Sequence, residues 1–221
     1  MLDSRLSAVA DLVRSGTRFA DVGTDHAYLP TFLLMGGKIE YAVCSDLRKG
    51  PLKNAEETVK KYGVSDKVDL RLSDGLDAYS DGEVNEIAIA GMGGLLISEF
   101  IERTEWLKNT DIHLILQPMT HAEDLRKTFY ENGFYINKEV AVKDGDKLYI
   151  ILSAYFGGIS ETRTVSECVI GEIYKNTDSV SKEYLESILK KYIVKYEMLK
   201  KAGKDYHETE SIVKELRQCL K

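Results

Sequence analysis

The feature that most constrains this chain is the strand, glycine turn and helix encoded by residues 18–30. Residues 19–22 form a short apolar strand that breaks at Gly23, where a residue without a Cβ atom permits a tight turn and close approach by a ligand. Residues 27–34 then have a helical pattern, with Pro30 in the first turn, where a missing N–H is tolerated. Such a strand–loop–helix unit opens a nucleotide-binding α/β domain.

The loop itself indicates which nucleotide is bound. A dinucleotide site uses Gly-x-Gly-x-x-Gly, because the backbone must wrap around a pyrophosphate, and here only Gly23 is a glycine. Asp25 would repel a pyrophosphate and suits a cationic ligand. S-adenosylmethionine (SAM) carries a sulfonium and an ammonium group and no phosphate, so the loop favours SAM over NAD or ATP. The alternative is that Asp25 only caps the helix and Gly23 only makes a turn.

The composition fits one α/β core with a small appendage, since the chain has 221 residues of which 43% are hydrophobic. No run approaches the length of a membrane span, and the first residues lack the pattern of a signal peptide, so we expect a cytoplasmic protein. The cysteines are too few and too scattered for a disulfide framework or a zinc site, so we expect reduced thiols and no metal; they are Cys44, Cys168 and Cys219.

The net charge of −6 argues against general affinity for nucleic acids. The charge is uneven, because residues 164–221 contain 11 Lys or Arg and 10 Asp or Glu, which leaves −7 for residues 1–163. Any binding of RNA must therefore come from local basic patches.

Acidic residues follow the next two predicted strands. Residues 41–46 are an apolar run ending in Asp46, which is placed to accept both ribose hydroxyls of a nucleoside. Capping of the following helix is the alternative role. Residues 68–73 alternate and lead into Asp74 and Gly75, where a carboxylate can accept from the exocyclic amine of adenine. An ordinary Asp-Gly turn is the alternative there.

Two further strands, residues 86–90 and 112–118, run toward the same rim of the sheet. Three glycines lie within residues 91–94, which implies close approach by cofactor or substrate, with a flexible connection as the alternative. Ligands of open α/β sheets bind beyond these strand ends. Gln117 faces this rim, whereas His113 is typical of a hydrogen-bonded core histidine.

Residues 134–142 and 147–156 form two more strands, joined by a hairpin signal at residues 143–146. Five alternating βα units that finish in a hairpin give a mostly parallel sheet with one antiparallel strand. We therefore predict, for residues 1–160, the Rossmann-like α/β fold of the seven-stranded class I SAM-dependent methyltransferases.

Residues 164–221 form the second predicted domain, a helical appendage. One apolar seam has the spacing of a coiled coil and consists of Leu185, Leu189, Tyr192, Tyr196 and Leu199. Shorter helices are predicted after Thr164 and after Gly203. Exposed lysines of the long helix are candidate phosphate contacts if the first domain modifies RNA, with a solvated helix face as the alternative; they include Lys190, Lys191 and Lys195.

With these residues in hand, the chain resembles the bacterial TrmK family of tRNA (adenine(22)-N1)-methyltransferases. The matching motifs are Leu-x-x-Arg-Leu at 2–6, Asp-Val-Gly-Thr-Asp-His-Ala-Tyr-Leu-Pro at 21–30, Gly-Pro at 50–51, Asp-Gly-Leu at 74–76, Ile-Ala-Gly-Met-Gly-Gly at 89–94 and Leu-Ile-Leu-Gln-Pro at 114–118. They cover the whole first domain, whereas the C-terminal helices match in character only. The resemblance implies SAM as cofactor, tRNA as partner and N1 of adenine 22 as the methylated atom.

One departure from other methyltransferases fits this target. Many enzymes that methylate amino groups carry an Asn-Pro-Pro-Tyr-type motif after the fourth strand, where this chain has residues 90–94. A ring nitrogen is therefore a better target than an exocyclic amine. Asp25 and His26 are the candidate catalytic residues, with a structural bond across the loop as the alternative for His26. Arg5, on an amphipathic helix over residues 2–14, would hold a substrate phosphate or close the site, unless it is only solvated.

The remaining assignments follow the strand-end loops. The residues expected to bind the cofactor are Asp21, Gly23, Thr24, Ala27, Asp46, Leu47, Asp74, Gly75, Ala90, Gly91 and Met92. The residues expected to contact tRNA are Arg5, Tyr28, Gly93, Gln117, Lys190, Lys191 and Lys195. The alternative functions are methylation of another RNA or a small molecule, and a non-catalytic module that binds RNA or protein. The oligomeric state is left open, with a slight preference for a monomer.

Overall fold

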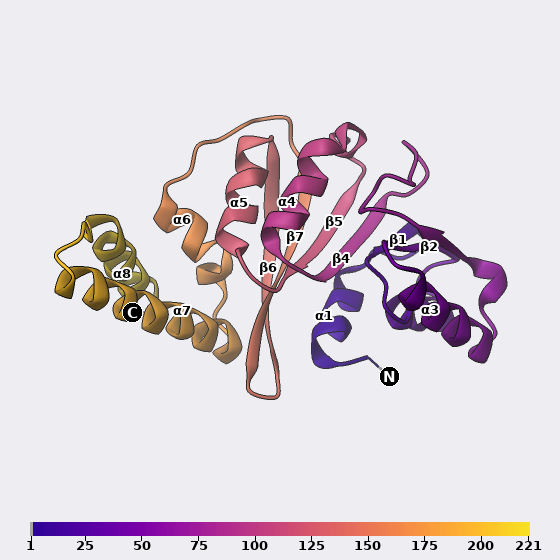
Figure 1. Cartoon of the computed structure of the whole chain (residues 1–221), viewed down its shortest axis with the longest axis horizontal. Coiled ribbons are helices and arrows are strands. Elements are labelled where there is room, and N and C mark those ends of the chain that lie inside the picture. The colour runs from indigo at the N-terminus through magenta and orange to yellow at the C-terminus, as the bar shows by residue number, and fades with distance from the viewer. Residues whose placement is uncertain (1) are drawn as a thin grey trace.

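The computed structural model describes residues 2–221 and contains one seven-stranded sheet (Figure 1). The strands are β1 Arg18–Val22, β2 Tyr41–Asp46, β3 Val68–Leu72, β4 Glu86–Met92, β5 His113–Pro118, β6 Phe134–Asp144 and β7 Lys147–Phe156. The helices are α1 Ser4–Leu12, α2 Tyr28–Met35, α3 Lys49–Lys61, α4 Gly94–Arg103, α5 Ala122–Glu131, α6 Val165–Ile170, α7 Ser179–Lys201 and α8 His207–Cys219.

The strand order is β3-β2-β1-β4-β5-β7-β6. The first five strands are parallel, whereas β7 is antiparallel to both β5 and β6. This is the layout predicted for a class I SAM-dependent methyltransferase, so the predicted fold class is confirmed. The carboxyl ends of the parallel strands meet at one rim, where the loops singled out in the sequence come together.

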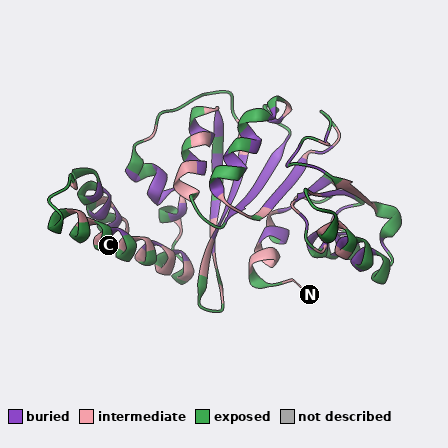
Figure 2. Ribbon diagram, in the orientation of Figure 1, coloured by how far each residue is buried: buried purple, intermediate pink, exposed green. Residues whose placement is uncertain are grey.

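Helices cover both faces of the sheet because the central strands are buried on both sides (Figure 2). One hydrophobic cluster packs α1, α2 and α3 against one face. The other cluster packs α4 and α5 against the opposite face and continues into α6, α7 and α8. The hydrophobic core is therefore continuous between the catalytic fold and the appendage, and the domain boundary drawn at residues 160–164 stays a prediction.

A buried ion pair attaches the appendage to the sheet. Arg126 of α5 and Glu139 of β6 are fully buried, and Arg126 Nε lies 2.7 Å from Glu139 Oε1. The same guanidinium donates to the carbonyl oxygens of Cys168 and Val169 in α6. Because Gly171 follows α6 in contact with this guanidinium, a Cβ atom there would overlap it. This arrangement fixes where the chain leaves the catalytic fold.

His113 lies at the opposite end of the sheet from the rim and is 2% exposed. Its Nδ1 lies 2.7 Å from Glu86 Oε1 and its Nε2 lies 2.7 Å from Ser153 Oγ. Arg14 Nε donates to the other carboxylate oxygen of Glu86 at 2.6 Å. The prediction that His113 is a hydrogen-bonded core histidine is confirmed.

The cysteines are free thiols, as expected, with Cys44 and Cys168 buried. Burial raises the pKa of the Cys44 thiol well above its usual range, helped by the charge of Asp21, so this thiol is not a nucleophile. Within residues 2–221, no helix combines the length and apolar character needed to cross a bilayer.

Candidate active site

A cavity of about 250 Å³ lies where β1 and β4 end, under the N-terminal helix α1. Its lining includes much of the predicted loop: Asp3, Arg5, Leu6, Asp21, Gly23, Thr24, Asp25, His26, Ala27, Tyr28, Leu29 and Ala90. Three carboxylates and one guanidinium therefore line a small space, together with further polar side chains, apolar side chains and glycine backbone.

The glycine turn has the close approach predicted for it. Gly23 has φ +80°, and its N–H and that of Thr24 both donate to the Ser45 carbonyl oxygen at 2.8 Å. A Cβ atom on Gly23 would overlap the methyl group of Met92, which packs over the turn from β4. The positive φ favours glycine at this position. Met92 thus lies both against the core and at the edge of the candidate cofactor site.

The start of α2 differs from the sequence-based expectation. Ala27 adopts a left-handed conformation with φ 51°, so α2 begins at Tyr28. The Thr24 hydroxyl, and not Asp25, accepts from the Ala27 N–H, at 3.1 Å. Asp25 does not cap this helix, so the alternative role considered for Asp25 does not hold and its carboxylate is left facing the cavity.

Asp25 and His26 form a shallow polar edge of this cavity. His26 Nε2 lies 3.5 Å from Asp25 Oδ2, and these side chains are 38% and 70% exposed, respectively. The imidazole stacks on the ring of Tyr28, with centroids 5.0 Å apart and planes at 7°. A substrate base could reach the side chains of Asp25, His26 and Tyr28, so the geometry is compatible with substrate binding. The roles of these three residues stay predictions.

Asp21 is the most electrostatically perturbed group of the cavity. Burial raises its pKa to about 6, opposed by a hydrogen bond from Thr24 and by the charge of Arg5. The side chain is 8% exposed, in agreement with a desolvated carboxylate. At neutral pH it is ionised yet poorly solvated, which favours a cationic ligand such as the ammonium group of SAM.

Gln117 lies beneath the rim and not on its surface. The side chain is fully buried, and its Oε1 accepts from Arg5 Nη1 at 2.8 Å and from the Gly91 N–H at 3.0 Å. Its Nε2 donates to the Pro118 carbonyl oxygen at 3.1 Å. Every polar atom of this side chain is engaged, so any influence of Gln117 on a substrate is indirect.

The predicted nucleoside end of the site continues along the rim to β2 and β3. Asp46 Oδ1 accepts from the Arg48 N–H at 2.8 Å, which supports the loop before α3, and its second oxygen is available for a ribose. Asp74 Oδ1 is paired with Arg103 at 3.2 Å. Gly75 has φ +55°, and a Cβ atom there would come within 2.6 Å of the Phe100 ring. Leu47 is exposed beside them.

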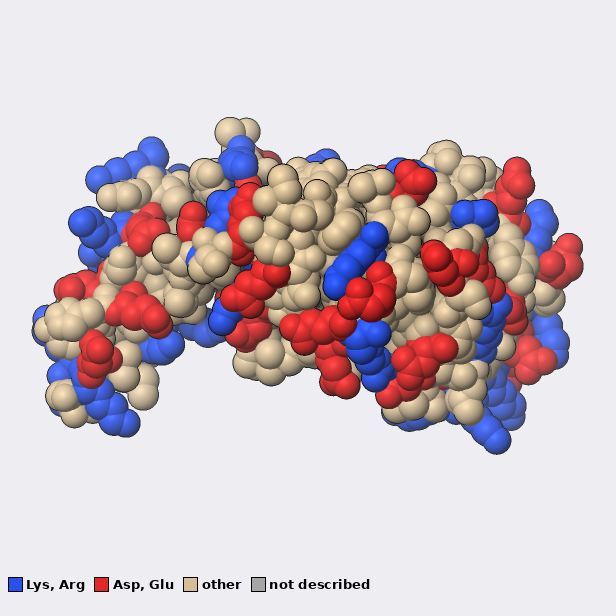
Figure 3. Space-filling view, turned by 90° about the horizontal axis from the view of Figure 1, so that it is seen from above, with Lys and Arg blue, Asp and Glu red and all other residues tan. Residues whose placement is uncertain are grey.

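The predicted tRNA-binding lysines lie outside the cavity, on the exposed surface of α7. Lys191 borders a groove of about 450 Å³ between α7, the start of α5 and the start of β7, which also contains Lys147 and Tyr149. The Nζ atoms of Lys191 and Lys195 lie 5.9 and 5.5 Å from the Tyr192 ring. Figure 3 shows basic side chains gathered at the α7–α8 end of the molecule, with acidic ones among them.

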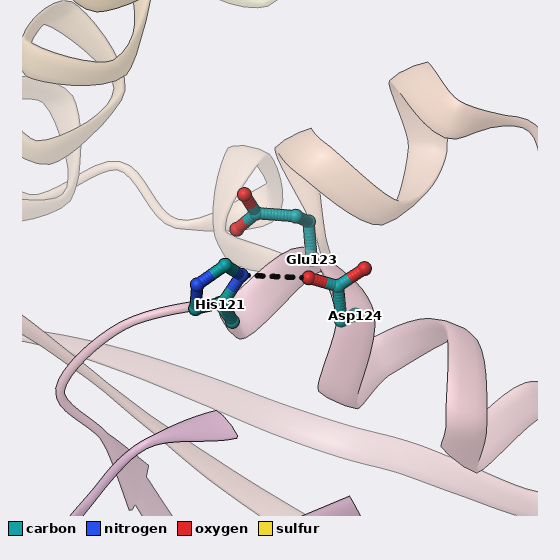
Figure 4. Close-up of side chains that lie close together, drawn as sticks. All are labelled: His121, Glu123 and Asp124. Carbon is teal, nitrogen blue, oxygen red and sulfur yellow. Dashed lines mark hydrogen bonds and ion pairs between the residues drawn. The ribbon is translucent and has the colours of Figure 1, made fainter. Parts of the chain in front are cut away.

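One group in the described residues 2–221 could approach a metal ion, namely His121, Glu123 and Asp124 (Figure 4). His121 is the N-cap residue of α5, and Glu123 and Asp124 lie in its first turn, where acidic side chains interact favourably with the helix dipole. His121 Nδ1 already lies 2.9 Å from Asp124 Oδ2. This pairing accounts for the geometry without an ion, and the absence of a metal stays a prediction.

Asp3, Leu6 and Leu29 line the cavity but were not among the predicted residues. Asp3 caps α1 by accepting from the Leu6 N–H at 2.7 Å, and it lies 3.5 Å from Arg5. An Asp immediately before an amphipathic helix is a sequence signal for such a cap. Because the cap orients α1, it also orients Arg5 over the cavity.

Comparison with known proteins identifies the fold's relatives. A methyltransferase-domain family matches residues 2–152. The tRNA (adenine(22)-N(1))-methyltransferase of Bacillus subtilis is 35% identical over 156 residues, which are 71% of this chain and 66% of that protein. The sequence alignment thus spans slightly less than two thirds of the relative.

Structural alignment extends through the appendage. The crystal structure of the B. subtilis m1A22 tRNA methyltransferase TrmK matches with a TM-score of 0.82 and 30% identity, covering 100% of this chain and 96% of that one. A candidate tRNA (m1A22) methyltransferase of Streptococcus pneumoniae, in complex with S-adenosyl-L-methionine, matches with a TM-score of 0.87 and 30% identity over the full length of both chains. The fold, including the appendage, therefore aligns with these structures, and this chain belongs to the TrmK family of tRNA methyltransferases.

Proposed function

We propose that this protein transfers the methyl group of SAM to N1 of adenine 22 in tRNA. The observation that carries the proposal is the cavity of Asp21, Gly23 and Asp25, which Ala90 of β4 also lines, within a chain that aligns over its full length with TrmK structures. The cavity offers carboxylates and a close backbone approach, which suit a cationic methionine end and no phosphate.

The residues of the rim fit SAM from one end to the other. Asp21 would hold the ammonium group and Gly23 would let the backbone approach the methionine portion. Asp46 would accept the ribose hydroxyls, and Asp74 would accept from the adenine amine of the cofactor. Leu47 and Met92 offer apolar contacts, with the remaining predicted contacts being Thr24, Ala27, Gly75, Ala90 and Gly91. Bound SAM supplies an electrophilic methyl group.

The chain's task toward the substrate is mainly alignment. Adenine N1 already has an in-plane lone pair, so no strong base is needed, and correct positioning can supply roughly 7–11 kcal/mol of the barrier reduction. The base must first leave the stacked tRNA structure, because N1 lies on its Watson–Crick edge. The methylated base is cationic, and the Asp25 carboxylate would stabilise that charge. His26 and Tyr28 would hold the base plane by stacking.

The appendage would hold the body of the tRNA, in a protein that works where tRNA is found, in the cytoplasm. Lys190, Lys191 and Lys195 are exposed on α7, which lies at one end of the molecule (Figure 1), so they would reach phosphates far from the target base. With a net charge of −6 on the whole protein, these local contacts have to provide the attraction. Arg5 and Gly93 would contact the substrate at the rim itself.

The test is transfer of labelled methyl groups from SAM to two unmodified tRNA transcripts, one with adenine and one with guanine at position 22. Label is expected on the adenine transcript alone. SAM binding is measured separately, so that absence of label on both transcripts with intact SAM binding would refute the tRNA assignment. Methyl transfer to a different RNA or to a small molecule would support the first alternative. Absence of SAM binding would support a non-catalytic module.

A pair of variants then tests the residue roles. Asp25→Ala is expected to lower kcat by about 10–100-fold, because the cationic product loses its counter-charge. His26→Ala is expected to raise the KM for tRNA with a smaller change in kcat, because stacking contributes to binding of substrate and transition state alike. Equal kcat values for Asp25→Ala and the unmodified enzyme would exclude the proposed charge stabilisation.

A further inference from the structure

A backbone bulge lies at the rim, at Gly91. The register of β4 with β5 pairs Ala90 with Gln117 and Met92 with Pro118, so it skips Gly91. Gly91 has φ +84° and is exposed at the rim. A bulged residue stands outside the hydrogen-bond ladder, and such bulges re-aim groups beside active sites. The Gly91 N–H is accordingly bonded by a side chain.

The side chain of Gln117 replaces the missing ladder partner. Its backbone is paired with Ala90, while its Oε1 accepts the Gly91 N–H at 3.0 Å. The same oxygen accepts from Arg5 Nη1 at 2.8 Å, so both lone pairs are used. The carboxamide is held in this orientation by its Nε2 donating to the Pro118 carbonyl oxygen. One buried side chain thus fixes both the bulge and the guanidinium above the cavity.

We infer that Gln117 is a positioning residue for base selection: by holding the Gly91 bulge it presents the Gly91 carbonyl oxygen to the C6 amine of the target base. The inference rests on the proposed function. Adenine carries an N–H donor next to N1, whereas guanine carries a carbonyl oxygen at the same place. A fixed backbone acceptor at this position binds adenine and opposes guanine, because two acceptors would face each other without a proton between them.

This role explains why the residue is glutamine. A Glu at position 117 would direct a second acceptor toward the Pro118 carbonyl oxygen, and a Met would leave the Gly91 N–H and Arg5 without an acceptor. The backbone accounts for glycine at 91, since φ +84° is rarely adopted by other residues. The amine is held in this arrangement and not methylated.

The experiment compares transcripts with adenine or unsubstituted purine, which lacks the C6 amine, at position 22. The ratio of kcat/KM for adenine to that for purine is measured in the unmodified protein, in Gln117→Met and in the control Gln218→Met. The control makes the same chemical change at an exposed position of the appendage. Loss of one positioned hydrogen bond is expected to lower the ratio about five- to tenfold in Gln117→Met and to leave it unchanged in the control.

SAM binding verifies that each variant is folded, and Gly91→Ala serves as a second variant because Gly91 lies at the surface. Gly91→Ala should lower the same ratio, since it distorts the bulge directly. A ratio that stays within twofold of the unmodified value in a Gln117→Met protein that binds SAM would overturn the inference. If Gln117→Met does not bind SAM, an unchanged ratio in Gly91→Ala overturns it instead. Absence of methylation of adenine 22 by the unmodified protein would refute the proposed function.

Discussion

Replacing Asp21 with Asn is expected to stabilise the cofactor-free protein at neutral pH while weakening its binding of SAM. Burial raises the pKa of Asp21 from 3.8 to about 6. A carboxyl with a raised pKa in the folded state stabilises the fold while it is protonated, below pH 3.8. That stabilisation is lost as the pH rises through about 6, because the folded protein must then hold a desolvated charge. Asn resembles the protonated form at every pH.

The magnitude follows from the pKa difference. A shift of about two units corresponds to roughly 3 kcal/mol between the fully protonated and fully ionised limits. Raising the pH from 4.5 to 7.5 should therefore lower the free energy of unfolding of the unmodified protein by about 2 kcal/mol relative to that of Asp21→Asn. Because the side chain is 8% exposed, little of this difference is screened by solvent.

The assay is urea unfolding of the unmodified protein, Asp21→Asn and Asp81→Asn at pH 4.5 and 7.5 without cofactor. Asp81 lies on an exposed turn and serves as the matched control. The free energy of unfolding of Asp21→Asn should rise relative to the unmodified protein by about 2 kcal/mol between the two pH values, and that of the control should not. Calorimetric titration should show SAM affinity falling below pH 6 in the unmodified protein. A pH-independent difference in unfolding free energy would refute the reasoning.

Two further predictions concern the appendage. Gly171→Ala should destabilise the protein by about 3 kcal/mol more than the control Gly145→Ala. Both glycines have positive φ, but only a Cβ atom at 171 would disrupt the buried ion pair of Arg126. Equal midpoints of the two variants in thermal unfolding would exclude this role of Gly171. Combined replacement of Lys190, Lys191 and Lys195 by Ala should weaken tRNA binding. The slope of log affinity against log salt concentration, measured by titration of tRNA at several salt concentrations, should become shallower by roughly 0.7–0.9 per lost phosphate contact. An unchanged slope would show that these lysines are only solvated.

The strands and the loop chemistry could be predicted from the sequence because they depend on local signals. The apolar run at residues 41–46 matches β2 in both bounds, and the break at Gly23 corresponds to a backbone with positive φ against Met92. The parallel order followed from alternating strands and helices. Asp46 and Asp74 could be placed at the rim because Asp46 ends one predicted strand and Asp74 follows the next; their roles toward a cofactor stay predictions.

The features that sequence reasoning missed depend on contacts between distant segments. The Gly91 bulge requires knowledge of the β4–β5 register, and the buried position of Gln117 requires knowledge of what α1 places above it. The left-handed Ala27 has no signal of its own, since alanine favours the helix it precedes. Likewise, the continuous core between sheet and appendage is invisible in a sequence whose pattern changes abruptly at residue 164.

These long-range contacts connect the two ends of the proposed substrate path through α5. The loop before α5 is bonded to the rim, since Met119 N–H donates to the Met92 carbonyl oxygen at 2.7 Å and Gly94 N–H donates to that of Thr120 at 2.8 Å. A Cβ atom at Gly94 would overlap this loop, so the two segments are in direct contact. In α5 itself, Arg126 holds the appendage. Helix α5 is thus bonded to the first helix of the appendage, while the loop before it is bonded to the end of β4. Under the proposed function, this connection would hold the phosphate-binding helices at a fixed distance from the reacting nitrogen.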